Sequence, residues 1–185
     1  MIEDFIQDAV RRMDRSVDAT QSEFNTVRTG RASTALLDRI HVDYYDTPTP
    51  LKQLATINVP EPRMLTIQPF DPSSMKAVEK AILESDLGLT PSNDGKVIRL
   101  PIPQLTEERR KELVKVVRQY AEDGRVAVRN VRRDVMHHLK ELVDSGDVGA
   151  DEEHRAEERV QKLTDEHVHR IDELLKRKEA EIMEV

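Results

Sequence analysis

The segment Leu105–Val143, LTEERRKELVKVVRQYAEDGRVAVRNVRRDVMHHLKELV, decides the fold. It contains no proline, and its apolar residues recur at intervals of three and four, the spacing of one helix face. We therefore predict a single long helix, capped at its start by Thr106. The predicted apolar face comprises Leu113, Val117, Tyr120, Ala127, Val131, Val135, His138 or Leu139, and Leu142.

A row of arginines follows the same helical period. Arg118, Arg125, Arg129 and Arg132 fall within about 60° of one another on a helical wheel, beside the apolar stripe. Arg133 lies next to them, and planar guanidinium groups suit phosphate. We expect these side chains to line an exposed flank of the helix, where they would bind an anionic partner.

The alternative interpretation of the arginine row is a solvated helix face. Two observations favour a ligand instead. Residues 109–133 contain nine Lys or Arg and only three acids, although the whole protein is acidic. Arg129 also has arginines four residues away on both sides, and like charges at this spacing repel. If the partner is duplex RNA, recognition would be of phosphates and shape. Arg28 and Arg31 could extend the patch.

Composition excludes several classes of function. The 185 residues include 36 Asp or Glu against 29 Lys or Arg, a net charge of −7, which argues against non-specific nucleic-acid binding by the whole molecule. Aromatic residues are 3%, too few for a base-stacking platform. Without cysteine there is no disulfide or thiolate nucleophile. No apolar run reaches the length of a membrane span, and the N-terminus does not resemble a signal peptide. We expect a soluble cytoplasmic protein.

Two further long helices are predicted, one before residue 30 and one after residue 149. Between Ile2 and Val27 the apolar residues follow a heptad pattern, which ends before Gly30. The predicted positions are Ile6, Val10, Met13, Val17, Thr20, Phe24 and Val27. The last helix is predicted to begin after the loop 145–149, with Asp151 as its cap. Gly124, inside the long helix, indicates either a bend or a close helix contact. Together the apolar faces of the three long helices predict an up-down-up three-helix bundle.

The intervening sequence has a different character. All nine prolines lie between Pro48 and Pro103. Short β-branched segments bounded by turn residues predict strands at 40–45, 55–59, 64–68 and 96–101. Asp71 and Pro72 predict the start of one short helix that ends at Gly88. We therefore predict an α+β protein, with a discontinuous bundle of residues 1–29 and 105–185 and an inserted β/α/β domain of residues 31–103.

No pattern predicts catalysis, a metal or a cofactor. The paired histidines at 137/138 and 167/169 diverge on a helix, and His154 with Glu157 and Glu158 is a weak ligand set. The sequence has no glycine-rich phosphate loop, nucleophile elbow or dinucleotide fingerprint. The bundle could instead belong to a coiled-coil or chaperone-like protein that docks other proteins. That alternative explains the acidity but not the concentration of arginines.

Motifs along essentially the whole chain resemble the ribosome recycling factor family of bacteria. The motifs that carry the resemblance are Val27–Ala32, Val42–Tyr45, Thr49–Leu51, Ser85–Leu89, Asn93–Gly95, Pro103–Lys111, Val128–Arg133 and Lys178–Met183. The resemblance implies the same α+β architecture, arranged as an L of roughly tRNA shape. One departure is Asp46, where the family usually has glycine. Because aspartate tolerates the left-handed conformation, we expect the turn to persist.

The resemblance also implies a function. A monomeric, non-enzymatic translation factor would bind the post-termination ribosome and, with elongation factor G and GTP, split it into subunits. The bundle would contact large-subunit rRNA, and elongation factor G would move the inserted domain about hinges near 29–31 and 101–104. The predicted rRNA-binding residues are Arg28, Arg31, Arg125, Arg129, Arg132 and Arg133. The predicted hinge residues are Thr29, Gly30, Arg31, Pro101, Pro103 and Gln104.

Overall fold

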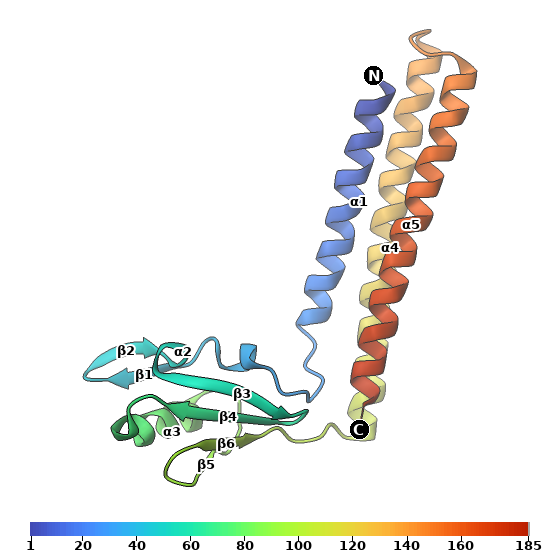
Figure 1. The fold of residues 1–185 in the computed structure, drawn as a ribbon. Coiled ribbons are helices and arrows are strands. Elements are labelled where there is room, and N and C mark those ends of the chain that lie inside the picture. The colour runs from blue at the N-terminus through green and yellow to red at the C-terminus, as the bar shows by residue number, and fades with distance from the viewer. Residues whose placement is uncertain (185) are drawn as a thin grey trace. The chain divides into compact units, whose positions relative to one another are not determined.

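The computed structural model describes residues 1–184, and its internal contacts divide the chain into two compact units. The first unit comprises Met1–Arg28 and Glu107–Glu184, and the second comprises Thr29–Thr106. The first unit is a bundle of three long helices (Figure 1): α1 (Ile2–Asn25), α4 (Glu107–Asp144) and α5 (Ala150–Met183). The α+β class and the three-helix bundle are as predicted.

Helix α1 buries one heptad face against the other two helices. The spacing prediction is confirmed with one change, because Ala9 is buried where Val10 is only half-buried. Val27 is also buried, although the helix ends at Asn25. The buried residues of α1 are Ile6, Ala9, Met13, Val17, Thr20 and Phe24.

The buried face of α4 differs from the prediction in the middle of the helix. Ala121, Gly124 and Val128 are buried there, whereas Tyr120 and Ala127 are half-buried. The reason lies at Gly124, where an added Cβ would overlap the Thr20 hydroxyl of α1 and lie 3.2 Å from Ile171 Cδ1 of α5. Small residues allow the three helices to approach closely at this level. Gly124 therefore marks a close helix contact.

Helix α5 starts without a side-chain cap. Gly149 occupies the N-cap position and Ala150 is the first helical residue, so the predicted cap at Asp151 is wrong. Asp151 lies in the first turn with two glutamates, where carboxylates interact favourably with the helix dipole. The buried face of α5 comprises Ala156, Val160, Thr164, His167, Ile171 and Ile182.

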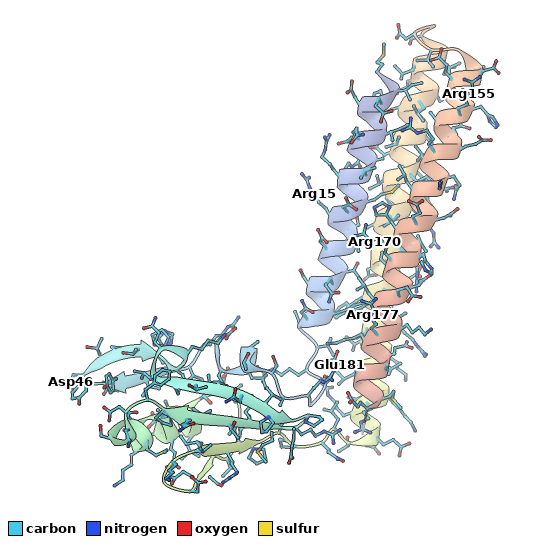
Figure 2. All side chains as sticks on the ribbon, in the orientation of Figure 1. Arg15, Asp46, Arg155, Arg170, Arg177 and Glu181 are labelled. Carbon is cyan, nitrogen blue, oxygen red and sulfur yellow. The ribbon has the colours of Figure 1, made fainter. Side chains whose placement is uncertain are left out.

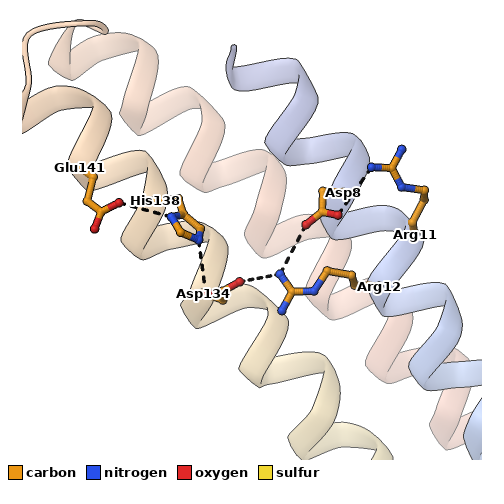
Figure 3. A network of polar contacts seen from close by, with 6 residues as sticks. All are labelled: Asp8, Arg11, Arg12, Asp134, His138 and Glu141. Carbon is orange, nitrogen blue, oxygen red and sulfur yellow. Dashed lines mark hydrogen bonds and ion pairs between the residues drawn. The ribbon is translucent and has the colours of Figure 1, made fainter.

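Polar side chains fix the register between the helices. Arg12 of α1 bonds Asp134 of α4 at 2.5 Å and also contacts Asp8, and His138 extends the network to Glu141 (Figure 3). The hydrogen bond from Arg12 is the largest cause of the lowered pKa of Asp134. Such pairs define one alignment of α1 along α4.

A second polar contact joins α1 to α5. His167 is buried, and its Nε2 lies 2.8 Å from Asp14 Oδ1 while its Nδ1 lies 2.6 Å from the Leu163 carbonyl oxygen. Arg170 bonds the same Asp14 oxygen at 2.8 Å. Hydrogen bonds from Arg170 and His167 lower the pKa of Asp14. His167 is therefore a buried histidine with both nitrogens occupied.

The second unit contains a four-stranded antiparallel sheet, in the order β3-β4-β6-β5, and a separate two-stranded hairpin, β1-β2. Its core contains Val42, Leu65, Val78 and Leu100, all fully buried. The elements are η1 (Thr34–Leu37), β1 (His41–Tyr44), β2 (Thr47–Pro50), α2 (Leu51–Leu54), β3 (Ala55–Glu61), β4 (Met64–Pro69), η2 (Pro72–Ser74), α3 (Met75–Glu84), β5 (Ser92–Asn93) and β6 (Ile98–Pro101).

The hairpin turn is formed by Tyr45 and Asp46, with φ of 49° and 62°. Positive φ at both central residues is the requirement of a tight type I′ connection, and Tyr44 pairs directly with Thr47 across it. Figure 2 shows Asp46 at the tip of the hairpin. The expectation that the turn persists with aspartate is confirmed.

The short helix begins as predicted but ends earlier. Asp71 accepts a hydrogen bond from the Ser73 amide at 2.9 Å, and Pro72 is the first residue of the 3₁₀ turn η2. Helix α3 ends at Glu84, so the predicted end at Gly88 is wrong. Gly88 lies in the following loop with φ of 66°.

Candidate nucleic-acid interface

The arginines of α4 separate into two groups. Arg118, Arg125 and Arg132 are seven residues apart, so every second turn brings one of them to the side of α4 that faces α5. Arg118 Nε donates to Glu179 Oε1 at 2.6 Å, and Arg125 Nε donates to Asp172 Oδ1 at 2.7 Å. These contacts join α4 to α5 at successive points along the two helices.

Arg125 is not the solvent-facing side chain that the sequence predicted. Its side chain is 20% exposed, and it bonds both Asp172 of α5 and Glu122 of α4. Burial opposes its charged form, but hydrogen bonds to the two carboxylates outweigh burial and raise its pKa. The acids that neutralise Arg125 include one from a distant part of the sequence. Its principal contact is therefore within the bundle.

Arg132 is intermediate between the two groups. It is half-buried, and its Nη1 donates to Gln161 Oε1 at 2.8 Å. Its Nε is buried and has no hydrogen-bond partner among residues 1–184. Gln161 therefore fixes the direction of a guanidinium that still carries its full positive charge.

Arg129 and Arg133 form the outward group, four residues apart on α4. Arg129 is 44% exposed and its nearest acid, Glu122, is 3.8 Å away. Arg133 is exposed and forms no ion pair or hydrogen bond with any residue that the structure describes. The two guanidiniums are available to bind an external anion.

A hollow on the surface of α4 and α5 continues from the outward arginines. It has a volume of about 410 Å³, and we call it the basic hollow. Two of its residues, His137 and Lys140, do not belong to the predicted arginine row, although they follow Arg133 at intervals of four and seven on the same helix face. The lining residues are Arg132, Arg133, Met136, His137, Lys140 and Glu157.

Arg28 is not brought together with Arg129. Helices α1 and α4 run antiparallel, with Arg12 opposite Asp134 and Thr20 opposite Gly124. If the same alignment is continued past the end of α1, Arg28 lies opposite a residue about thirteen positions before Arg129 in α4. This is roughly 20 Å from Arg129 along the helix axis. Arg28 is exposed and Arg31 belongs to the second unit.

The predicted hinge residues lie in the two segments that connect the units. Gly30 has φ of 75°, and a Cβ there would lie 3.4 Å from both the Pro103 carbonyl oxygen and Leu105 Cγ. Thr29 is buried and Arg31 is exposed. Pro101 ends β6, and Pro103 and Gln104 are exposed in the segment before α4.

Residues 1–184 contain no group of three or more side chains that could hold a metal ion. The exposed histidines His137, His154 and His169 each face a glutamate four residues further along the same helix. Within the described part of the chain, no helix combines the length and apolarity required to cross a membrane.

Comparisons with known proteins agree over the whole chain. A family model described as Ribosome recycling factor matches residues 20–183. The ribosome-recycling factor of Rubrobacter xylanophilus is 58% identical over 180 residues, 97% of each chain, and that of Bacillus subtilis is 55% identical over the full length of both.

Two solved structures are also similar. A solution structure of a ribosome recycling factor has a TM-score of 0.73 and 45% identity, over 100% of this chain and 98% of the other. The second, with a TM-score of 0.63, 45% identity and full coverage of both chains, is the recycling factor of T. thermophilus. That structure combines the factor with E. coli elongation factor G, bound to the E. coli post-termination complex.

Proposed function

The chain belongs to the ribosome recycling factor family, and from that premise we propose that it acts on the post-termination ribosome with elongation factor G and GTP. Members of this family are translation factors and not enzymes. The partners are taken from the similar T. thermophilus factor, whose structure includes elongation factor G and a post-termination complex. The result of the action would be separated subunits, available for a new round of translation.

In this proposal the helical bundle binds large-subunit rRNA through α4. Arg129 and Arg133 contact phosphates directly, because their guanidiniums face outward. Arg132 joins them in an orientation fixed by Gln161. Arg125 contributes by holding α5 against α4 and not by contacting RNA. Arg28 and Arg31 would also contact rRNA, Arg28 at a place on the bundle separate from this cluster.

The second unit is the part that elongation factor G would move. Its two connections to the bundle, at 29–31 and 101–104, would serve as hinges, so that force applied to the second unit rotates a bundle held on RNA. The chain would act as a monomer in the cytoplasm, where translating ribosomes are found. GTP would be hydrolysed by elongation factor G.

The observation that carries the RNA contact is the guanidinium of Arg133, unpaired among residues 1–184 and beside Arg129 in a protein of net charge −7. Like charges held four residues apart on a helix lower its stability by about 0.2 to 0.5 kcal/mol, so their presence here favours an anionic partner.

The test is the binding of the chain to large ribosomal subunits at several salt concentrations. With three or four phosphate contacts, log affinity should fall against log salt with a slope of about −2 to −4. Arg133→Ala should weaken binding on the order of tenfold and make the slope about 1 less steep. Arg155→Ala is the matched control and should bind as the unaltered chain does, because Arg155 of α5 (Figure 2) is exposed and has no ion pair within the described residues. A response independent of salt, or equal effects of the two substitutions, would contradict the proposal.

A further inference from the structure

The basic hollow begins at Arg132 and Arg133, two of the arginines to which the RNA contact has been assigned, and continues past them to Lys140. We propose that it is a second phosphate-binding subsite, which holds a backbone phosphate of the same RNA strand between Arg133 and Lys140. This inference rests on the proposed function and extends its contact surface along α4 toward the α4–α5 loop.

The helical period explains why the hollow is lined as it is. Arg132, Met136 and Lys140 follow one another at intervals of four, and Arg133 and His137 repeat that interval one position further along. One face of two successive turns therefore supplies five of the lining residues. Glu157 of α5 supplies the remaining one.

The charges around the hollow are not balanced within the protein. Arg132, Arg133 and Lys140 are cationic, whereas Glu157 is the single acid among the lining residues. Neither Arg133 nor Lys140 forms an ion pair or hydrogen bond with residues 1–184, and Glu157 likewise forms none. His137 Nε2 lies 3.0 Å from Glu141 Oε1, so that acid faces the histidine. An anion in the hollow would meet two uncommitted cationic side chains and a third, Arg132, that Gln161 holds in place.

The chemistry of the lining favours a nucleic-acid phosphate over an acidic protein segment. Guanidinium groups bind phosphate with two parallel hydrogen bonds, and the lysine adds a compact charge. Met136 provides an apolar surface between the cations, against which a ribose can pack. From Arg129 to Lys140 the cations extend about 16 Å along the helix, a length that several successive phosphates of one strand span.

The first test compares two lysines of the bundle. Lys140→Ala should weaken binding to purified large subunits about threefold to tenfold and make the salt slope about 1 less steep. Lys162→Ala removes the same charge from a different hollow, between α1 and α5, where the lysine is exposed and has no ion pair within residues 1–184. It should leave affinity and slope unchanged. Equal effects of the two substitutions, or no effect of Lys140→Ala, would overturn the inference.

The second test changes the opposite charge and should give the opposite sign. Glu157→Gln removes the one acid that lines the hollow, so it should strengthen binding to large subunits about twofold to fivefold. Glu158→Gln is the matched control, because Glu158 is exposed and contacts His154 at 3.3 Å on the same helix. If the two glutamine variants strengthened binding equally, the effect would be one of net charge and the hollow would have no special role.

The third test identifies what occupies the hollow. The chain has no cysteine, so His137→Cys introduces a unique thiol at the rim, to which a photo-crosslinker can be attached. On large subunits we expect crosslinks to rRNA. Crosslinks to ribosomal protein alone would overturn the assignment of an RNA phosphate.

These results separate the two proposals. If the unaltered chain did not bind large subunits, both would fail. If the chain bound with a steep salt dependence and Arg133→Ala weakened it, while the Lys140 and Glu157 variants had no effect, only the subsite would be wrong.

Discussion

Arg125 and Arg133 show how the same side chain takes different roles eight residues apart on one helix. Arg125 contacts Asp172 and Glu122 and is mostly covered. Arg133 faces outward, with no partner among the residues described. Eight residues turn the helix by about 80° beyond two full turns, so Arg125 faces Asp172 of α5 and Arg133 does not. The paired arginine stabilises the bundle, and the unpaired one is available to a ligand.

Stability measurements should separate these roles. Arg125→Ala leaves Asp172 without its cation, so we expect it to lower the free energy of unfolding by about 1 to 2 kcal/mol in urea denaturation. Arg133→Ala should change the same quantity by less than about 0.5 kcal/mol, because it breaks no contact within the described residues. If the two substitutions destabilised the bundle equally, the division of the arginines into clamping and ligand-facing groups would be incorrect.

The spacing of the arginines could be read from the sequence, but their partners could not. Asp172 and Gln161 come from a helix 47 and 29 residues away from the arginines they contact. Only the antiparallel register of α4 and α5 brings them together. Lys140 and His137 could have been found, because they repeat the helical interval beyond Arg133. The predicted row leaves them out because it contains arginine alone.

At the scale of elements, α4 depends on small residues at its midpoint. Gly124 lowers the intrinsic stability of a helix by about 1 kcal/mol relative to alanine, yet here it faces Thr20 and Ile171 with no room for a methyl group. The tertiary contact outweighs the local propensity. This is why the buried face passes through Ala121 and Val128 and leaves the bulkier Tyr120 half-buried.

Replacing Gly124 with alanine should therefore destabilise the bundle, although alanine has the higher helix propensity. Gly124→Ala should lower the free energy of unfolding by about 1 to 3 kcal/mol through overpacking, measured by urea denaturation. A second substitution, Thr20→Ala, removes the hydroxyl that the added methyl would overlap, so it should restore part of the lost stability. A double-mutant cycle measures this coupling between the two residues. Gly149→Ala, where the added methyl meets open space, is the control and should cost only about 0.5 kcal/mol through a weaker N-cap. A stabilising Gly124→Ala would contradict the close contact.

Short elements were harder to predict than long ones. Strand β2 is absent from the predicted strands because Pro48 and Pro50 argue against a strand, although proline is tolerated at a sheet edge such as this two-stranded hairpin. The long helices carry many repeats of one pattern, so a single misleading residue does not hide them. A four-residue strand offers no such redundancy.

At the scale of the whole molecule, the chain leaves the bundle after Arg28 and returns to it at Glu107. Composition and periodicity predicted the bundle, the inserted domain and an anionic partner. The ribosome entered only through motifs spread along the entire chain, which the comparisons bear out at the level of the family. The partner of a basic surface cannot be derived from that surface alone, because any strand of phosphates offers similar charge.

The proposed hinge makes a prediction about Gly30. Alanine at φ of 75° is strained, and its methyl would press on the segment at Pro103 and Leu105. We expect Gly30→Ala to slow ribosome splitting with elongation factor G severalfold, while binding to large subunits stays within about twofold. Gly88→Ala has similar backbone strain at φ of 66° but no neighbour within 4 Å, so it is the control for strain alone. Equal losses of splitting and binding would argue against a hinge.

The most direct test of the account is a splitting assay on purified post-termination ribosomes, followed by light scattering. The complete mixture contains this chain, elongation factor G and GTP, and each control lacks one of the three. We predict that subunits separate only in the complete mixture, and that Arg133→Ala slows their separation where Arg155→Ala does not. Intact ribosomes in the complete mixture, or equal splitting without this chain, would contradict the central claim.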